Sequence, residues 1–388
     1  MKIARQERTD PKTKNTYKQD YSMTTTYNHN NTIPYLLELA YTNWDNAELL
    51  GKIGVEMEAR TRLDIARRVL ERALFLNPLH HPEWYLSFAF AHFRDTTGNF
   101  SGDGEKILID GIEETNSDYL KASYLSLFEG NSEELAELIE DLRSSEDLSV
   151  RFALGHSLLW RGDTDDACSL LRATIAEIDE NAVPLGLEAY CGAMNWMRGQ
   201  GMAIDLEHEV LSHLQRAIHS SPDVYNYRAL QIQAFQTLRD YKRVAEAAHE
   251  TLLHFPDEET TMFALATAYE KLDNQTNALL WYNRAIGAKP SYARARVMLG
   301  KLYEQRGELD AAESVFRDIG IANPSYNMGK LEIAYFLKRI GKEKEAVALF
   351  RYAYDRLKTF EKASVEQHPE GKIFVNAMLS LELPILMN

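Results

Sequence analysis

The stretch PSYARARVMLGKLYEQRGELDAAESVFRDIGIANP, from Pro290 to Pro324, decides the fold of this chain. It begins and ends with proline, and its two runs of helical spacing are separated by the segment RGELD. Prolines also occur at positions 222 and 256, so an interval of 34 residues recurs three times. Proline cannot continue the hydrogen bonding of a helix, whereas a glycine such as Gly307 can adopt positive φ and end one. The interval therefore predicts a series of short helix pairs.

Small residues recur at fixed places within this unit. A large apolar residue precedes a small one at Leu265-Ala266, Leu299-Gly300 and Ile333-Ala334, and a second small position holds Ala278, Ala312 and Ala346. Large residues at i, i+4 and i+7 give each helix one apolar stripe. A small side chain where two helices cross lets their axes approach closely, so the pattern predicts two tightly packed helices per unit.

Taken together, the period, the small and bulky positions and the terminal proline resemble the tetratricopeptide repeat family. The same register fits the segments around Gly54 and Gly155, and three stretches between residues 80 and 222 depart from it. The resemblance implies an all-α fold, a right-handed α-solenoid of about nine helix pairs over residues 45–360, because one pair cannot bury both of its faces alone. We expect a basic polar arm at 1–33, divergent repeats at 34–146, a regular array at 147–360, and a capping helix with an apolar tail at 361–388.

The C-terminal segment GKIFVNAMLSLEL predicts a further helix. Its apolar residues have i, i+4 spacing in two sets, which are Ile373, Ala377 and Leu381, and Phe374 and Met378. We expect this amphipathic helix to cap the last repeat. A helix that docks on a partner is the alternative, because the trailing PILMN is also apolar.

Composition excludes several classes of protein. The 388 residues carry a net charge of −15, which disfavours binding of a phosphate backbone by the main surface. The two cysteines, Cys168 and Cys191, form no CxxC pair and are expected to be buried thiols in a reducing compartment. No run of about 18 apolar residues predicts a membrane span, and the N-terminus lacks the apolar region of a signal peptide. A cytoplasmic protein is expected, although a chain from which a signal had been removed would look the same.

No motif predicts catalysis, a metal or a cofactor. The histidines of HEVLSH (His208 and His213) and HETLLH (His249 and His254) are spaced i, i+5, whereas chelation from one helix needs i, i+4. The segment GNFSGDG, Gly98–Gly104, lacks the Lys-Ser/Thr pair of a phosphate loop and the acidic spacing of a calcium loop, so it is expected to be an extended turn.

The resemblance also implies a binding surface. In the tetratricopeptide repeat family, the first helix of each pair lines the concave groove, and its second, fifth, ninth and twelfth residues face that groove. The candidate groove residues on this basis are Phe152, His156, Asn226, Gln233, Phe263, Arg294, Val297, Lys301, Met328, Leu331 and Tyr335. The alternative for the large ones is packing between neighbouring repeats. No fifth and ninth pair is Lys/Asn, so binding of chaperone carboxyl tails is disfavoured, and an amphipathic helix or extended peptide suits the groove better.

The first 30 residues carry six basic against three acidic side chains, ahead of an acidic body. On composition this arm is expected to be disordered alone and to dock on an acidic surface, either its own, that of a second copy or that of a partner. The leading hypothesis is a non-enzymatic scaffold, adaptor or assembly factor that binds one or more proteins. The alternative is a regulatory sensor of a peptide or ligand, and an enzyme or a nucleic-acid binder is disfavoured.

Overall fold

The structure is a computed structural model that describes residues 32–79, 81–93, 102–127, 133–178, 183, 186–324 and 326–382. Nearly all of the predicted N-terminal arm, and the tail from residue 383, lie outside these described residues. Every regular element in the described ranges is helical, so the fold is an all-α helical repeat, as the sequence predicts. The handedness of the superhelix stays a prediction.

Nine helix pairs follow one another along the described chain, as expected from the repeat. Their first and second helices are α2 (Ala47–Ala59) and α3 (Leu63–Leu76), α4 (Pro82–Phe93) and α5 (Gly102–Thr115), α6 (Asp118–Tyr124) and α7 (Glu133–Arg143), α8 (Leu148–Trp160) and α9 (Thr164–Ala176), α10 (Leu187–Gly199) and α11 (Ser212–Ser220), α12 (Tyr225–Thr237) and α13 (Tyr241–His254), α14 (Glu259–Lys271) and α15 (Gln275–Ala288), α16 (Ala293–Gln305) and α17 (Leu309–Ala322), and α18 (Asn327–Arg339) and α19 (Glu343–Tyr354).

Short elements flank or extend these pairs. Helix α1 (Ile33–Thr42) precedes them, and α20 (Thr359–Gln367) and α21 (Pro369–Glu382) follow them. A 3₁₀ turn, η1 (Leu125–Leu127), extends α6, and a π-helical turn, η2 (Glu207–Leu211), leads into α11. Of the predicted turn at Gly98–Gly104, residues 98–101 lie outside the described residues, and residues 102–104 belong to α5.

The turn within a pair depends on one left-handed residue. Gly307 and Gly341 have φ of 76° and 80°, which confirms their predicted role in ending first helices. The equivalent positions one and two repeats earlier hold Asp273 and Arg239, both with φ of 58°. Thr61 takes the same conformation between α2 and α3, with φ of 57°. A β-branched residue rarely adopts this conformation, so the Thr61 turn is strained.

The small positions lie where the helices of one pair cross. A Cβ added to Gly54 would come within 2.4 Å of the Leu70 side chain, and one added to Gly300 would come within 2.8 Å of Phe316. Ala278, Ala312 and Ala346 are fully buried at the second crossing position. The close approach predicted from the repeat is therefore present in pairs from both ends of the chain.

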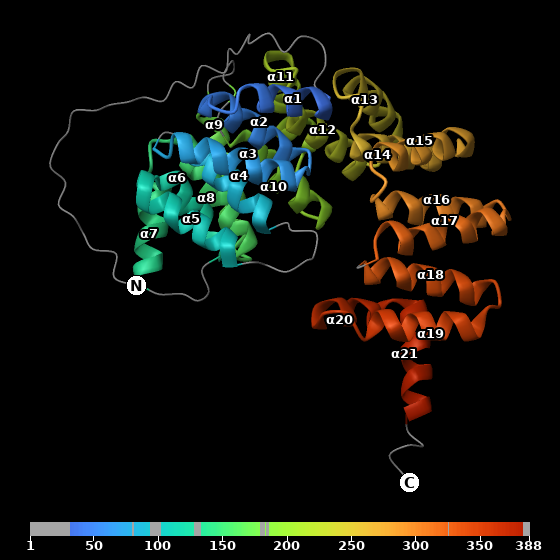
Figure 1. Ribbon diagram of the computed structural model, residues 1–388. Helices are drawn as coiled ribbons and strands as arrows, with labels where there is room; N and C mark the ends of the chain where they lie inside the picture. The colour runs from blue at the N-terminus through green and yellow to red at the C-terminus, as the bar shows by residue number, and fades with distance from the viewer. Residues whose placement is uncertain are drawn as a thin grey trace.

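The first six pairs curl into a closed ring. Their first helices contact one another in the order α2, α4, α6, α8, α10, α12, and α12 returns to contact α2. We call these six helices the ring. Figure 1 shows α1–α12 gathered into a rounded body, whereas α14–α19, which we call the C-terminal stack, run away from it toward the C-terminus. The predicted boundary at residues 146 and 147 remains a prediction, since the ring includes repeats on both sides of it.

Helices α20 and α21 close the C-terminal stack. Phe374 of α21 is buried and stacks on Phe350, with ring centroids 4.5 Å apart, and His368 stacks on Tyr335 at 5.3 Å. Capping by the C-terminal helix is thus observed. The two predicted apolar sets differ, however, because Ile373 is 53% exposed. Helix α20, which the sequence reading did not separate from the preceding repeat, adds a turn before the cap.

Candidate functional site

The predicted groove residues divide into two groups by burial. Phe152, Phe263, Leu331 and Tyr335 are buried, so they fill the packing between helices. The half-exposed or exposed ones on the C-terminal part of the chain are Asn226, Gln233, Arg294, Val297, Lys301 and Met328. We call these six the first-helix row, since they lie on α12, α16 and α18. Their role in binding stays a prediction.

Phe152 and His156 lie on α8, within the ring and apart from the first-helix row. The Phe152 ring meets Tyr190 edge to face, with centroids 5.8 Å apart. His156 Nε2 accepts a hydrogen bond from Trp160 Nε1 at 3.2 Å. Burial lowers the pKa of His156, so its imidazole is neutral at neutral pH. These two residues therefore lie on the ring, as do Asn226 and Gln233 of α12, whereas the other seven lie on α14, α16 and α18.

Arg294 is the most exposed cation of the first-helix row, and an aromatic ring holds it in place. Its guanidinium lies 5.0 Å from the centre of the Phe263 ring, which also contacts Tyr282 and Tyr292. The Tyr282 hydroxyl donates to Glu270 at 2.7 Å. A cation fixed over aromatic rings in this way can pair with an incoming carboxylate without a large loss of side-chain freedom.

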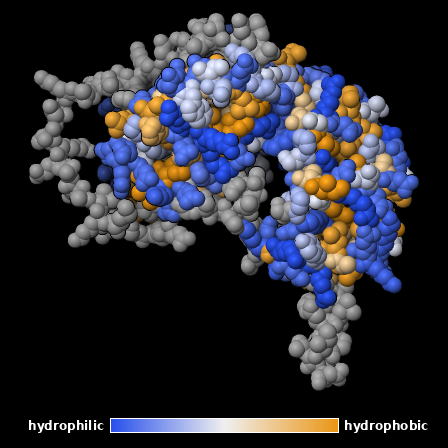
Figure 2. Space-filling view, viewed as in Figure 1, coloured by the Kyte–Doolittle hydropathy of each residue, from blue (hydrophilic) through white to orange (hydrophobic). Residues whose placement is uncertain are grey.

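Ion pairs connect neighbouring repeats beside that cation. Lys301 Nζ lies 3.0 Å from Glu332, which joins α16 to α18. Arg339 donates to both oxygens of Glu304, at 2.7 and 2.9 Å, and to Glu370 of the cap at 2.7 Å. In Figure 2, apolar patches alternate with these hydrophilic regions along the C-terminal stack. The surface of the stack is therefore mixed, as the sequence predicts.

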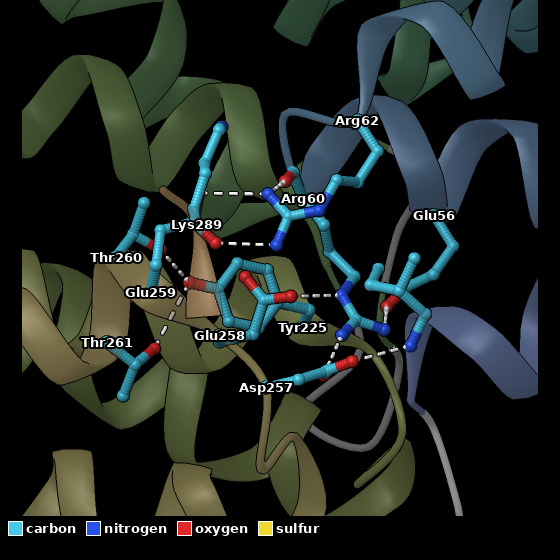
Figure 3. A network of polar contacts seen from close by, with 11 residues as sticks. Glu56, Arg60, Arg62, Tyr225, Asp257, Glu258, Glu259, Thr260, Thr261 and Lys289 are labelled. Atoms are coloured by element: carbon cyan, nitrogen blue, oxygen red, sulfur yellow. Dashed lines mark hydrogen bonds and ion pairs between the residues drawn. The ribbon is translucent and has the colours of Figure 1, made fainter. Parts of the chain in front are cut away.

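A second polar cluster joins the first repeat to the seventh, across nearly 200 positions of sequence (Figure 3). Arg60, at the end of α2, has a side chain with no exposed surface. Its Nε donates to Glu258 at 2.5 Å and its terminal nitrogen donates to Asp257 at 2.8 Å. Arg62 donates to both oxygens of Glu259, at 2.9 and 2.6 Å. Both arginines therefore bind one acidic turn between α13 and α14.

Further residues complete this cluster, which we call the junction network. Lys289, at the end of α15, donates to Glu259 at 3.0 Å. The Ile33 amide donates to Asp257 at 2.7 Å. The hydroxyl of Tyr225, at the start of α12, lies 2.6 Å from that of Thr260. Glu56 lies 3.9 Å from Arg60. Five parts of the chain thus meet at the point where the ring passes into the C-terminal stack.

The pKa values of these carboxyls shift in opposite directions, because the opposing effects of burial and of the neighbouring cations differ from one carboxyl to the next. Burial raises the pKa of Glu258 to about 7, against the attraction of Arg60, and raises that of Glu56 to about 8. Burial also acts on Glu259, but hydrogen bonds and charges from Arg62 and Lys289 lower its pKa overall. Glu259 is therefore ionised at neutral pH, whereas Glu56 is largely protonated.

Sequence reasoning missed the junction network. The two runs that form it, RTR at 60–62 and DEE at 257–259, are short, occur at turns and are opposite in charge. That charge match is the one signal present, and nothing in a single sequence pairs turns so far apart. Residues 60–62 occupy the position where other repeats place a glycine, and this departure could have marked the turn as special.

The histidines of the HEVLSH and HETLLH segments point to other contacts or to solvent. His208 is 87% exposed, and His213 meets the edge of Tyr190. His249 hydrogen-bonds with the Tyr269 hydroxyl at 2.8 Å. Within the described ranges, no three His, Cys, Asp or Glu side chains are arranged to hold a metal ion. In the same ranges, no helix has the length and apolar content needed to cross a membrane.

Comparisons with known proteins agree with the repeat. The tetratricopeptide repeat family model matches residues 229–293 and 284–327. No curated protein sequence matches the chain. Among solved structures, MamA is 19% identical over 44% of this chain and 96% of its own, with a TM-score of 0.36. MamA from Desulfovibrio magneticus RS-1 is 13% identical over 47% of this chain and 98% of its own, with a TM-score of 0.39.

A third similar structure is YrrB, described as a TPR protein with an unusual peptide-binding site. It is 17% identical over 52% of this chain and 95% of its own, with a TM-score of 0.34. The two matched segments extend from α12 to the start of α18, where the helix pairs and left-handed turns are most regular. The chain thus contains tetratricopeptide repeats over residues 229–327.

Proposed function

We propose that this protein is a non-enzymatic scaffold that binds a partner peptide or helix along the first helices of the C-terminal stack. The observation that carries the proposal is the first-helix row. From α12 to α18 it presents polar, cationic and apolar side chains that the neighbouring helices leave at least partly exposed. Tetratricopeptide repeats are typically interaction modules rather than catalysts, and an amphipathic partner would use both kinds of contact.

Arg294 is the residue with which to test this proposal. A random peptide library selected against the whole protein would supply a ligand, and affinity would be measured for Arg294→Ala and Met328→Ala. We expect each change to weaken binding about tenfold, as loss of a central contact does. Leu253→Ala is the matched control, because Leu253 is 82% exposed on a second helix. Equal affinities for all four proteins would overturn the groove proposal.

The arm at residues 1–33 supports a second contact in the same proposal. The chain enters the body at Ile33, whose amide binds Asp257, so the basic arm joins the body beside an acidic turn. Replacing the six basic residues of the arm by glutamine in the full-length protein should weaken partner binding and reduce its dependence on salt. Unchanged affinity and unchanged salt dependence would remove the arm from the proposal.

We also propose a cytoplasmic location and a role in assembling other proteins. Both cysteines, Cys168 and Cys191, are free and buried, which fits a reducing compartment. Purification of the tagged protein from its native cells after fractionation tests both points at once. Recovery from an oxidising compartment, or recovery of a single partner that assembles normally without this protein, would contradict them.

A regulatory sensor is the second candidate function. The observation that favours it is the junction network, because charged side chains join the first repeat to the turn before α14. A scaffold needs only a fixed groove, whereas a sensor needs an element with two arrangements.

A further inference from the structure

The contact between the first repeat and the turn before α14 is made by polar groups, although α14 itself shares an apolar cluster with ring helices such as α12. The buried apolar residues of α1–α6 form one cluster, and those of α6–α14 form another. Helix α12 contacts α2, but the groups that join the first repeat to α14 are the arginines and carboxylates of the junction network. The contact between the first repeat and α14 therefore lies outside both apolar clusters, with the buried Phe255 ring beneath Arg60.

The carboxyls at the junction outnumber the cations. Three cations, Arg60, Arg62 and Lys289, contact three carboxyls, Asp257, Glu258 and Glu259. Further carboxyls lie at the same place. Glu56 has one oxygen without a hydrogen-bond partner among the described residues, as does Glu258. A full set of ionised carboxylates would thus leave excess negative charge in a buried site.

Titratable groups approach Glu56 and Glu258 from every side of the junction. Helix α10 contributes Glu188, and the turn before α12 contributes Asp223. The whole set, element by element, is Glu56, Glu58 and Arg60 of α2, Arg62 of the following turn, Glu188 of α10, Asp223 and Tyr225 around the start of α12, Asp257 and Glu258 of the turn before α14, Glu259 of α14, and Lys289 after α15. Carboxyls outnumber cations in this set.

We propose that the junction network is a proton-controlled latch, which holds the ring closed while Glu56 and Glu258 retain protons and opens it when both are ionised. The ligand of this site is the proton. Opening separates α2 from α12 and α14 and exposes the inner faces of the ring helices, which the closed ring covers. The strained Thr61 turn, which holds Arg60 and Arg62 on either side, relaxes when the arginines are released.

The direction of the pH effect follows from the raised pKa values. In the closed ring the pKa of Glu56 is about 8 and that of Glu258 about 7, because both are buried. In an open ring, solvent returns both to the ordinary range near 4.5. Between the ordinary and the raised pKa values the closed form binds more protons, so raising the pH from about 4.5 to about 8 favours the open form. Glu259 has a lowered pKa and keeps its pairs with Arg62 and Lys289 until the pH falls below the ordinary range.

Small-angle X-ray scattering of the full-length protein tests the latch without any partner. We expect the radius of gyration to rise as the pH is raised from about 5 to about 8, and to stay constant above about 8. Amide hydrogen exchange at the facing ends of α2 and α14 should become about tenfold faster for each pH unit over which one carboxyl titrates, after correction for the intrinsic effect of pH. Exchange within α16 and α18 should not change.

Variants separate the latch from general alkaline unfolding. The double change Glu56→Gln and Glu258→Gln should abolish the transition and keep the ring closed at about pH 9. Arg60→Met should give the expanded form at both pH values. The control is Arg143→Met, which removes a two-point pair with Asp166, at 3.0 and 2.5 Å, inside the ring but away from the junction.

Three results would overturn the proposal. They are a wild-type protein whose scattering does not change with pH, a double carboxyl variant that still expands, and an Arg143→Met protein that expands as Arg60→Met does. If Arg60→Met fails to fold, the carboxyl variants still decide, because glutamine preserves the shape of each side chain. None of these measurements involves the first-helix row, so the latch and the proposed groove fail separately.

Discussion

The left-handed turn between paired helices allows an exchange experiment between adjacent repeats. Positions 239, 273, 307 and 341 are equivalent, and they hold Arg, Asp, Gly and Gly with φ of 58°, 58°, 76° and 80°. The backbone demand is the same at each position, but only two of the four carry the residue that meets it without strain. We expect Arg239→Gly to stabilise the protein and Gly307→Ala to destabilise it.

The magnitude follows from the local structure. A Cβ added to Gly307 would meet no atom within 4 Å, so the effect is confined to the backbone. A non-glycine residue in the left-handed region costs about 1–2 kcal/mol. Removing glycine also restricts the unfolded chain, which offsets about 0.4–1 kcal/mol. The net change in the free energy of unfolding is about 1 kcal/mol, unfavourable for Gly307→Ala and favourable for Arg239→Gly.

Urea unfolding followed by circular dichroism measures this difference, with native-state hydrogen exchange to place it. Exchange is needed because repeat arrays need not unfold in one step. Gly287→Ala serves as the control, since Gly287 lies inside α15 and an added Cβ there also meets no atom within 4 Å. That change should stabilise the helix by about 1 kcal/mol. A neutral Gly307→Ala, or a destabilising Arg239→Gly, would refute the reasoning that the backbone alone sets these residues.

Three other changes test other parts of the fold. Phe374→Ala removes a buried ring from the cap, and a loss of about 3 kcal/mol should appear as faster hydrogen exchange in α20 and α21 only; uniform loss along the chain would contradict it. Gly54→Ala places a methyl group against Leu70. The resulting overpacking costs about 1–3 kcal/mol, which should outweigh the gain in helix propensity of about 1 kcal/mol, so urea unfolding should show a less stable protein. A more stable variant would show that α2 and α3 can move apart. Glu259→Gln should reduce the loss of unfolding free energy in acid, measured by urea unfolding at several pH values. The reason is that Glu259 has a lowered pKa, so its ionised form contributes stability that is lost as the pH falls through that value. An unchanged loss of stability in acid would assign the effect to other carboxyls.

The regular part of this chain could be predicted because its information is local. The proline interval, the small residues at crossings and the turn glycines each constrain neighbours within one 34-residue unit. Gly307 and Gly341 took the predicted conformation for that reason. The capping helix could be predicted as well, although Ile373 and Phe374 alternate in a way that periodicity alone could not resolve, since either set fits one helical face.

The ring and the junction network could not be predicted, because they depend on how small angles accumulate over six repeats. Each divergent pair changes the angle between itself and the next pair, and no single residue determines the size of that change. The candidate groove suffered from the same limit. Leu331 and Tyr335 occupy groove positions by register, but the cap that follows α19 covers that region, and His368 stacks on Tyr335.

Ring closure also changes how this chain is made. In an ordinary repeat array each unit packs only on its neighbours, so folding can follow synthesis one repeat at a time. Here Arg60 and Arg62 meet their partners only after residues 257–259 have left the ribosome, 197 or 198 positions later. Until then, the nascent chain carries an open first repeat with two arginines that have not yet reached these carboxyls. A chain truncated before residue 257 would thus have every ring helix but would lack the carboxylates that bind Arg60 and Arg62.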